Sequence, residues 1–268
     1  MEPAVLIMPS ILTLTGAGRG GGGAAPTGTA VDVLVRLETG TSGHKMFVAD
    51  LNSSTLGLGS NTWSLVGTGT YPEWDNAGDQ NTPGLSVGGV GYTDPNAGVV
   101  RFPLSPQPLA DDYCLLTMSP TRANLCLGFM YRFNTATAGF WTYNGVRIDT
   151  TAGAFFSLSV DTDGTSTIQI YAHGAANGSN IAASQDKWYW ITMSRTNTTS
   201  AVVRVYDPAS SYSLVGTSTA TLSASDAVTA IRFGITDSGS IGGAAAAASI
   251  VWDDIAIVYA SATFVPAP

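Results

Sequence analysis

From Val31 onward, apolar and polar residues alternate with the period of two that is typical of β-strands. The alternating segments are short, and Gly, Asn, Asp, Pro or Ser residues bound them. No stretch longer than about ten residues has the i, i+3, i+4, i+7 apolar spacing of an amphipathic helix. We predict very little helix, and strands at 31–37, 98–102, 125–133, 140–143, 154–160, 167–172, 188–195, 201–207, 229–236 and 250–259.

Two pairs of these strands are expected to form β-hairpins. Strands 154–160 and 167–172 flank an Asp-Gly turn signal, and strands 188–195 and 201–207 flank a polar turn. Regularly spaced strands with turns between them favour two antiparallel sheets, packed face to face with alternate residues in the core. The predicted fold class is therefore an all-β, antiparallel two-sheet sandwich.

The first thirty residues have a different composition. Residues 15–30 include four successive glycines and Pro26 and lack an apolar period, as flexible linkers do. The apolar stretch before them has no Lys or Arg ahead of it, unlike a secretory signal. We expect an arm at 1–30, a single domain at 31–260 and a tail at 261–268. The arm either docks on a partner subunit or is a passive tail, and its docking candidates are Val5, Leu6, Ile7, Met8, Ile11, Leu12 and Leu14.

Composition narrows the range of partners. Only 11% of the residues are charged and 31 are Gly, so small hydroxyl and amide groups must make up most of the polar surface. A net charge of −8 argues against nucleic acid and against an anionic membrane surface as partners. No apolar run approaches the ~18 residues of a membrane span.

Cys114 and Cys126 are the only cysteines, too few for a disulfide scaffold or a Cys-rich zinc module. Two interpretations remain open. The favoured one is a pair of buried free thiols. The other is a single bridge, which requires strands 112–118 and 124–133 to be antiparallel neighbours.

Several motifs occur in a recognisable order. They are an opening strand and turn at 37–43, a central strand at 125–133, the hairpin at 154–172, the Trp-rich pair at 187–195 and 201–206, and the closing Trp-Asp-Asp-Ile-Ala-Ile at 252–257. In this order they resemble the concanavalin A-like or laminin-G-like jelly rolls of lectins, glucanases, and virion and cell-surface proteins. The resemblance implies a jelly roll over about residues 31–260.

In the closing strand, period two separates two sets of residues. One face is expected to carry Trp252, Asp254, Ala256 and Val258, and the other Val251, Asp253, Ile255 and Ile257. One aspartate must then face the apolar side or bind a neighbouring loop, as a structural anchor.

Catalytic chemistry is poorly represented. Glucanases of the resembled family carry an E-x-D-x-x-E cluster, with acid and nucleophile about 5.5 Å apart. This chain has three Glu, and only Glu73 has a carboxylate nearby, at Asp75. His44 and His173 are expected to be solvated loop residues rather than members of a catalytic triad. We therefore predict no enzyme activity.

Metal and cofactor sites are not expected either. Two His and two Cys are too few for a zinc site. Asp161, Asp163 and Gly164 are similar to part of a calcium loop, but hairpin turn chemistry explains them better.

Two aromatic clusters are candidates for sugar binding, because rings stack on sugar C–H faces while polar groups form hydrogen bonds at the rim. They are Glu73, Trp74, Asp75 and Asn76, expected in a loop, and Trp141, Tyr143 and Asn144, just after the central strand. The alternative is that Trp74 and Trp141 cap the ends of the core. Packing roles are expected for Trp63, Trp188, Trp190 and Trp252, with Trp188 and Trp190 on one face and partly exposed.

These patterns favour a non-catalytic structural or adhesive module of a virion, as a capsid decoration, fibre or tail component, or of a cell surface. Other subunits are the expected partners, with a glycan as a further one, and the arm is expected to support homo-oligomer assembly. The alternative is a secreted lectin or carbohydrate-binding module; a polysaccharide hydrolase or lyase is less favoured.

Overall fold

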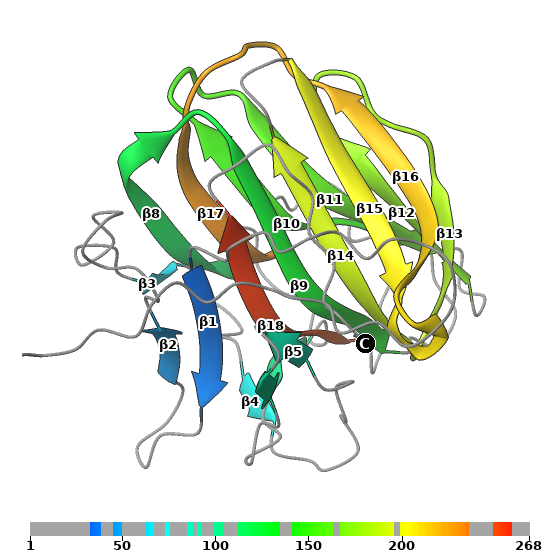
Figure 1. Ribbon diagram of the computed structural model, residues 1–268. Coiled ribbons are helices and arrows are strands. Elements are labelled where there is room, and N and C mark those ends of the chain that lie inside the picture. The colour runs from blue at the N-terminus through cyan, green and yellow to red at the C-terminus, as the bar shows by residue number, and fades with distance from the viewer. Residues whose placement is uncertain are drawn as a thin grey trace, which may run out of the picture.

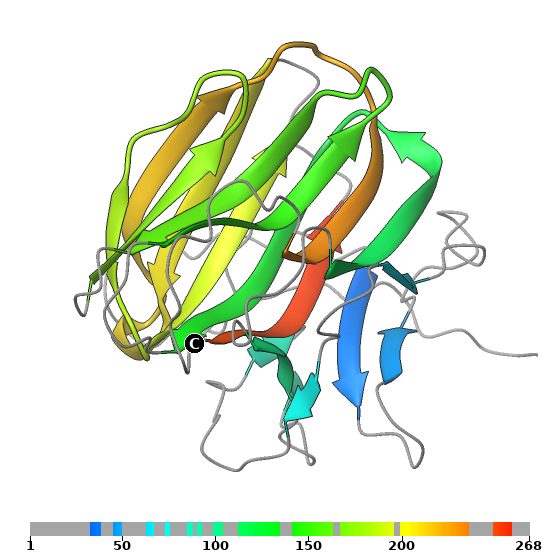
Figure 2. The same cartoon turned by 180° about the vertical axis from the view of Figure 1, so that it is seen from behind.

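The strand pattern of the sequence is realised as two large antiparallel sheets, seen from opposite sides in Figures 1 and 2. The structure is a computed structural model. It describes residues 33–38, 45–49, 63–66, 73–75, 85–87, 90–92, 99–103, 112–134, 141–162, 167–195, 199–235 and 249–258.

The first sheet has nine strands. Its order is β16 (Ser213–Thr221), β15 (Ser200–Asp207), β14 (Trp188–Arg195), β9 (Leu125–Asn134), β18 (Ser249–Val258), β1 (Val33–Glu38) and β2 (Lys45–Ala49). Strand β18 pairs with β1 through its second half, and through its first half with β7 (Val99–Pro103). Strand β7 pairs in turn with β4 (Glu73–Asp75), so these two strands form a branch of the sheet.

The second sheet has seven strands and faces the viewer in Figure 2. Its order is β13 (Ile181–Ser184), β12 (Thr167–His173), β11 (Phe155–Thr162), β10 (Trp141–Thr150), β17 (Val228–Ile235), β8 (Asp112–Arg122) and β3 (Trp63–Val66). A separate two-stranded ribbon joins β5 (Leu85–Val87) to β6 (Val90–Tyr92). The all-β, two-sheet sandwich is confirmed.

Aromatic residues join the two sheets through the core. Phe129 of β9 meets Phe233 of β17 edge to face, with ring centroids 5.9 Å apart. Phe233 meets Trp252 of β18 in the same manner at 6.5 Å. Edge-to-face pairs contribute about 0.5–1.5 kcal/mol beyond the burial of their area. This chain of rings therefore fixes the centre of one sheet against the centre of the other.

One side of the sandwich is closed where the edge strands of both sheets meet. The Ala172 amide of β12 donates a hydrogen bond of 3.0 Å to Ser218 Oγ of β16. Ile181 of β13 packs directly on Gly216, where an added Cβ would lie 2.7 Å from Ile181 Cγ2. The contact therefore requires glycine at position 216.

Both predicted hairpins are confirmed, since β11 pairs with β12 and β14 with β15. Strands β2, β3, β4, β5, β6, β13 and β16 were not predicted, and β8 was considered only as a condition of the cysteine bridge. Ser213–Thr221 in β16 illustrates why: it is rich in hydroxyl residues and lies at an edge, so it has no long run of buried apolar positions. Among the described residues, helix is confined to the 3-10 turn η2 (Pro208–Ser210).

The arrangement of β8 and β9 decides between the two cysteine interpretations. These strands follow each other in the chain but lie in different sheets, so they are not the antiparallel neighbours that a bridge requires. Cys126 is a buried free cysteine. The favoured prediction of a free thiol is confirmed for Cys126, and the bridge is wrong.

The alternation predicted for the closing strand is also wrong, because β18 contains a bulge. Its register with β9 shifts by one residue between Asp253 and Ala256. Trp252 and Ile257 are therefore both buried in the core, although strict alternation places them on opposite faces. The side chains of Asp253 and Asp254 lie outside the described residues, so the predicted aspartate anchor stays a prediction.

The packing roles of three tryptophans are confirmed, since Trp188, Trp190 and Trp252 are all buried. The partial exposure predicted for Trp188 and Trp190 is wrong. Within the described part of the chain, no helix is long and apolar enough to cross a membrane.

Candidate functional site

The register of the seven-stranded sheet places one set of polar residues on its outer face. Arg147 of β10 lies opposite Arg232 of β17 on one side and Ser157 of β11 on the other. Ser157 lies opposite His173 of β12. The next residue of β10, Ile148, is buried in the core. Since successive residues of a strand point to opposite faces, the four polar positions point away from the core.

An ion-pair cluster lies at the centre of this face. Arg147 Nε donates to Asp149 Oδ1 at 2.6 Å, and Arg232 Nε donates to Asp149 Oδ2. The side chains are 20% exposed for Arg147, 24% for Arg232 and 13% for Asp149. Two guanidinium groups thus share a single carboxylate, which leaves this Arg147–Asp149–Arg232 cluster with an excess positive charge.

Aromatic rings flank the cluster on both sides. The Arg147 guanidinium carbon lies 4.1 Å from the centroid of the Phe155 ring, and Phe155 stacks on His173 at 5.7 Å with an interplanar angle of 14°. On the other side, the Arg232 guanidinium lies 4.7 Å from the Tyr113 ring and donates a 2.8 Å hydrogen bond to its hydroxyl. We call these residues the outer-face row: Tyr113, Arg232, Asp149, Arg147, Phe155 and His173.

Ser157 lies within this row, between Arg147 and His173 in the register. Its side chain is fully buried, and its Oγ has no hydrogen-bond partner. An unsatisfied buried hydroxyl costs about 1–3 kcal/mol. Ser157 Oγ is therefore positioned to bind a water molecule or a ligand group.

The polar face continues toward β13. Tyr171 of β12 donates a 3.5 Å hydrogen bond to Asp161 Oδ1 of β11. Burial, and after it the charge of Asp161, raises the pKa of Tyr171 above its usual value. The phenol therefore stays neutral at physiological pH and remains a hydrogen-bond donor.

The first cluster predicted from the sequence lies elsewhere. Glu73, Trp74 and Asp75 form strand β4 of the nine-stranded sheet, where they pair with β7. The predicted loop placement is wrong for these three residues, because β4 is a short strand at the end of a branch of the sheet. Their side chains and Asn76 lie outside the described residues, so their sugar-binding role stays a prediction.

The second predicted cluster lies on the same strand as Arg147. Trp141, Tyr143 and Asn144 belong to β10, which places them in the opposite sheet from β4. In the register Tyr143 is opposite Val160 and Asn144 opposite Ser159. Adjacent positions of a strand face opposite sides, so the three positions do not share one face. Their side chains, and the arm residues from Val5 to Leu14, are outside the described part, and their predicted roles are open.

The sequence analysis missed the outer-face row. It also placed His173 in a solvated loop, whereas His173 ends strand β12 and stacks on Phe155. The available signal was the pattern Val-Arg-Ile-Asp at 146–149 and Ile-Arg-Phe at 231–233, where charged residues alternate with core residues.

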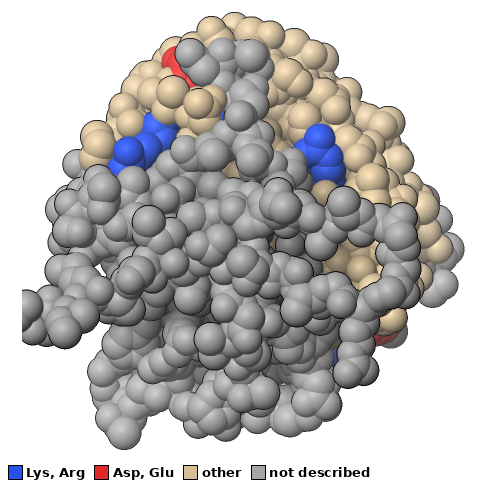
Figure 3. Space-filling model, in the orientation of Figure 1, with Lys and Arg blue, Asp and Glu red and all other residues tan. Residues whose placement is uncertain are grey.

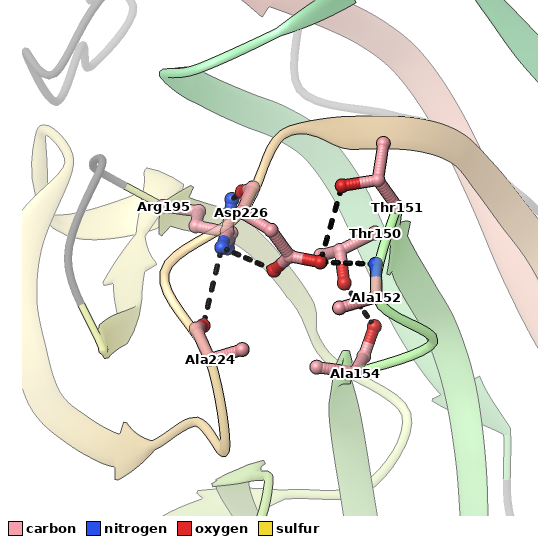
Figure 4. A network of polar contacts seen from close by, with 7 residues as sticks. All are labelled: Thr150, Thr151, Ala152, Ala154, Arg195, Ala224 and Asp226. Carbon is pink, nitrogen blue, oxygen red and sulfur yellow. Dashed lines mark hydrogen bonds and ion pairs between the residues drawn. The ribbon is translucent and has the colours of Figure 1, made fainter.

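A different polar network lies at one end of the sandwich (Figure 4). Arg195, at the end of β14, has a fully buried side chain and forms a 3.1 Å ion pair with Asp226 Oδ1. Its guanidinium also donates to the backbone carbonyls of Asp226 and, at 3.4 Å, of Ala224. Asp226 Oδ2 in turn accepts from the Ala152 amide and from Thr151 Oγ1 at 3.3 Å. We call this network the Arg195–Asp226 clamp.

The clamp holds two charged groups in a mostly buried place. Burial lowers the pKa of Arg195, and the Asp226 carboxylate opposes this effect. For Asp226, burial acts to raise the pKa, but the Ala152 amide, the Thr150 hydroxyl and the Arg195 charge together bring it below its usual value. The clamp ties the end of β14 to the β16–β17 connection and to the β10–β11 turn, while the buried Nε of Arg195 has no hydrogen-bond partner.

The described residues contain no group of three or more His, Cys, Asp or Glu side chains that could hold a metal ion. Asp161, one of the residues compared above with part of a calcium loop, lies in strand β11 and accepts a hydrogen bond from the Tyr171 hydroxyl. Asp163 and Gly164 lie outside the described residues.

Fold and site together define a two-sheet β-sandwich with a polar and aromatic row on one sheet face. No protein-family model and no curated protein matches the chain. Among solved structures, it is similar to the botulinum neurotoxin serotype C1 binding domain, with 10% identity over 87% of this chain and 49% of that one, at a TM-score of 0.49. It is also similar to the binding domain of botulinum neurotoxin DC in complex with SialylT, with 10% identity over 87% of this chain and 48% of that one, at a TM-score of 0.47.

The serotype G binding domain gives 12% identity over 87% of this chain and 48% of that chain, with a TM-score of 0.45. The chain thus spans about half the length of these structures. At such scores the similarity supports no argument about what this chain binds, and the argument for function rests on its own residues.

Proposed function

We propose that this protein is a non-catalytic adhesive or structural module of a virion, as a capsid decoration, fibre or tail component, or of a cell surface. We further propose that it binds glycans on the outer face of the seven-stranded sheet. The observation that supports binding is the outer-face row, in which half-buried rings and hydrogen-bond donors lie beside the unpartnered Ser157 hydroxyl.

The chemistry of the row suits a sugar. A pyranose presents apolar C–H groups that pack against partly exposed rings such as Phe155, and hydroxyls that bind donors at the rim. The row is carried by hydrogen-bonded strands, so a sugar would meet groups already held in place. Preorganised groups lose little conformational entropy on binding.

The carboxylates on this face support the non-catalytic part of the proposal. Both oxygens of Asp149 accept hydrogen bonds from arginines, which leaves them unsuited to act as a general base. Asp161 accepts from Tyr171 on another pair of strands. A glycosidase needs two carboxyl groups set across the scissile bond. A panel of polysaccharides incubated with the protein should release no reducing sugar.

Figure 3, which views the nine-stranded sheet, shows a mostly uncharged described surface with a few charged spots. The direct test is a glycan-array screen of the full chain, followed by titration of the best ligands against Phe155→Ala. We expect an affinity loss of about tenfold, since stacking and burial of one ring contribute on the order of 1–2 kcal/mol.

Leu214→Ala is the matched control, because Leu214 is an exposed apolar residue on β16 of the other sheet, 55% exposed. It should bind like the unchanged protein. If Phe155→Ala binds normally while Trp74→Ala or Trp141→Ala does not, the glycan site is at the clusters predicted from the sequence instead. If no glycan binds, the adhesive part of the proposal fails.

The assembly role of the arm needs its own measurement. Light scattering over a dilution series should give a defined multimer for the full chain. Leu6→Asp with Ile11→Asp, which puts charges into the apolar arm, should reduce it to a monomer while glycan binding is retained. A monomeric, glycan-binding full chain would favour the alternative, a secreted lectin or carbohydrate-binding module.

A further inference from the structure

The donors of the Arg147–Asp149–Arg232 cluster outnumber its acceptors. Asp149 uses its two oxygens for the two Nε atoms, one at 2.6 Å. Tyr113 accepts from Arg232 Nη1. Among the described residues, none accepts a hydrogen bond from either Nη of Arg147 or from Arg232 Nη2. These three groups are therefore available to a ligand.

The two guanidinium groups are also held in fixed orientations. Each lies over an aromatic ring, Arg147 over Phe155 and Arg232 over Tyr113. Each is fixed in addition by its Nε bond to Asp149. A guanidinium presents a planar fork of donors that matches a carboxylate, and fixing it in advance reduces the entropy lost on binding.

The charge balance indicates which ligand suits these donors. Two arginines and one aspartate give the cluster a formal excess of one positive charge, in a chain whose net charge is −8. A neutral ligand leaves this excess uncompensated in a half-buried place. A ligand with one negative charge balances it, and its oxygens accept from the three available groups.

We infer that the outer-face row binds an acidic sugar, with its carboxylate at Arg147 and Arg232 and its apolar C–H groups against the part of Phe155 that stays exposed beside Arg147 and His173. Ser157 Oγ, fully buried between Arg147 and His173 in the register, would bind a water molecule that bridges to the ligand. This inference rests on the proposed function, because it names the class of glycan for the same site.

The test compares each acidic sugar with its own uncharged methyl ester. Oligogalacturonate and 3′-sialyllactose, each as the free acid and as the methyl ester, are titrated into the full-length protein by calorimetry. We expect at least one free acid to bind about tenfold or more tightly than its ester, since hydrogen bonds to charged groups contribute the most. Higher salt should weaken binding of the acid more than that of the ester.

Variants connect the preference to the cluster. Arg147→Ala and Arg232→Ala should each weaken binding of the acid about tenfold or more and leave ester binding within about twofold. Arg147→Lys keeps the positive charge but loses the planar fork of donors. Its affinity for the acid should therefore lie between that of Arg147→Ala and that of the unchanged protein. Arg204→Ala, which removes the same charge from β15 of the other sheet, is the matched control and should bind normally. Circular dichroism melting curves verify that each variant is folded.

The outcomes separate this inference from the proposed function. If acid and ester bind equally and Phe155→Ala weakens both, the glycan site stands and the acidic-sugar inference is overturned. If only sulfated dextran binds and no carboxylate sugar does, the inference is also overturned. If no glycan binds in any form, both fail.

Discussion

Two sites in this molecule pair arginine with aspartate, but they differ in burial and in the partners of their arginines. In the Arg195–Asp226 clamp the arginine side chain is fully buried, and it donates to one carboxylate and two backbone carbonyls. In the Arg147–Asp149–Arg232 cluster the arginines are 20% and 24% exposed and keep unused donors. Both Nη groups of Arg195 donate to its own chain, although its buried Nε has no partner, whereas neither Nη of Arg147 has a partner among the described residues. Burial and the bonds of the terminal nitrogens, rather than residue type, separate the structural ion pair from the candidate binding site.

The position of each site in the topology explains the difference. The clamp lies where the chain passes from β16 of one sheet to β17 of the other, and it joins that crossing to the β10–β11 turn at 150–154. Backbone carbonyls are unpaired there and accept from Arg195. The cluster lies in the middle of a sheet, where the strands satisfy each other's backbone groups. Its arginines therefore find only side chains as partners.

The largest effect is expected from Arg195→Ala. It leaves Asp226 without its counter-charge and two carbonyls without a donor, so the free energy of unfolding should fall by about 3–5 kcal/mol. Urea denaturation followed by tryptophan fluorescence measures this loss. Arg147→Ala removes an arginine from the partly exposed cluster and should cost no more than about 1 kcal/mol. Equal losses in the two variants would remove the distinction between the sites.

Asp226→Asn should give the next largest effect, about 1.5–3 kcal/mol at pH 7, because the bonds of the carboxylate to its donors are charge-assisted. The pKa of Asp226 is lower in the folded protein than in the unfolded chain. Its contribution is therefore present above about pH 4 and is lost as the pH falls through the folded-state pKa. The difference between this variant and the unchanged protein should shrink from pH 7 to pH 3. A difference that does not change with pH would contradict the lowered pKa.

A smaller effect is expected from Gly153→Ala, in the turn that supplies the Ala152 amide to the clamp. Gly153 has a φ of +76°, and no atom lies within 4 Å of an added Cβ. The change should therefore cost only backbone strain, about 1–2 kcal/mol. Thermal unfolding, with Gly153→Asn as a better tolerated control, measures it. No loss with Ala would show that the turn relaxes without disturbing the clamp.

The smallest effect is expected from Tyr113→Phe in the outer-face row. It removes the acceptor of Arg232 Nη1 and keeps the ring beneath the guanidinium. Stability should fall by about 1 kcal/mol or less, since Arg232 is partly solvated. Acid-sugar affinity should change by about threefold or less. A much larger loss of affinity would indicate that the Tyr113 hydroxyl contacts the ligand itself.

The hairpins could be predicted from the sequence because their signals are local. Phe155–Thr162 and Thr167–His173 alternate on both sides of an Asp-Gly turn, and each strand buries one face. The strand at Ser213–Thr221 was missed because its pairing at the edge of the sheet, and not its own pattern, holds it in place. The bulge in β18 was missed because the inserted residue shows only in the register with β9.

The outer-face row could not be assembled from the sequence. Tyr113 and Arg232 are 119 residues apart, and only the pairing of β8 with β17 brings them together. Arg147 and Asp149 are two residues apart on one strand and so share a face, but the predicted strand ended at residue 143 and did not include them. Which residues of other strands meet them depends on strand order, which sequence periodicity does not contain.

The sequence by itself determined that this is an all-β protein, where most of the long strands lie, and that its surface is acidic overall but sparsely charged. These properties follow from residue type and from the period of two, which each segment carries locally. Only the tertiary structure decided that Cys114 and Cys126 lie on strands of different sheets, that the Arg195 side chain is fully buried and that those of Arg147 and Arg232 are partly exposed. Such outcomes depend on the order and register of strands, which arise from contacts between segments far apart in the chain.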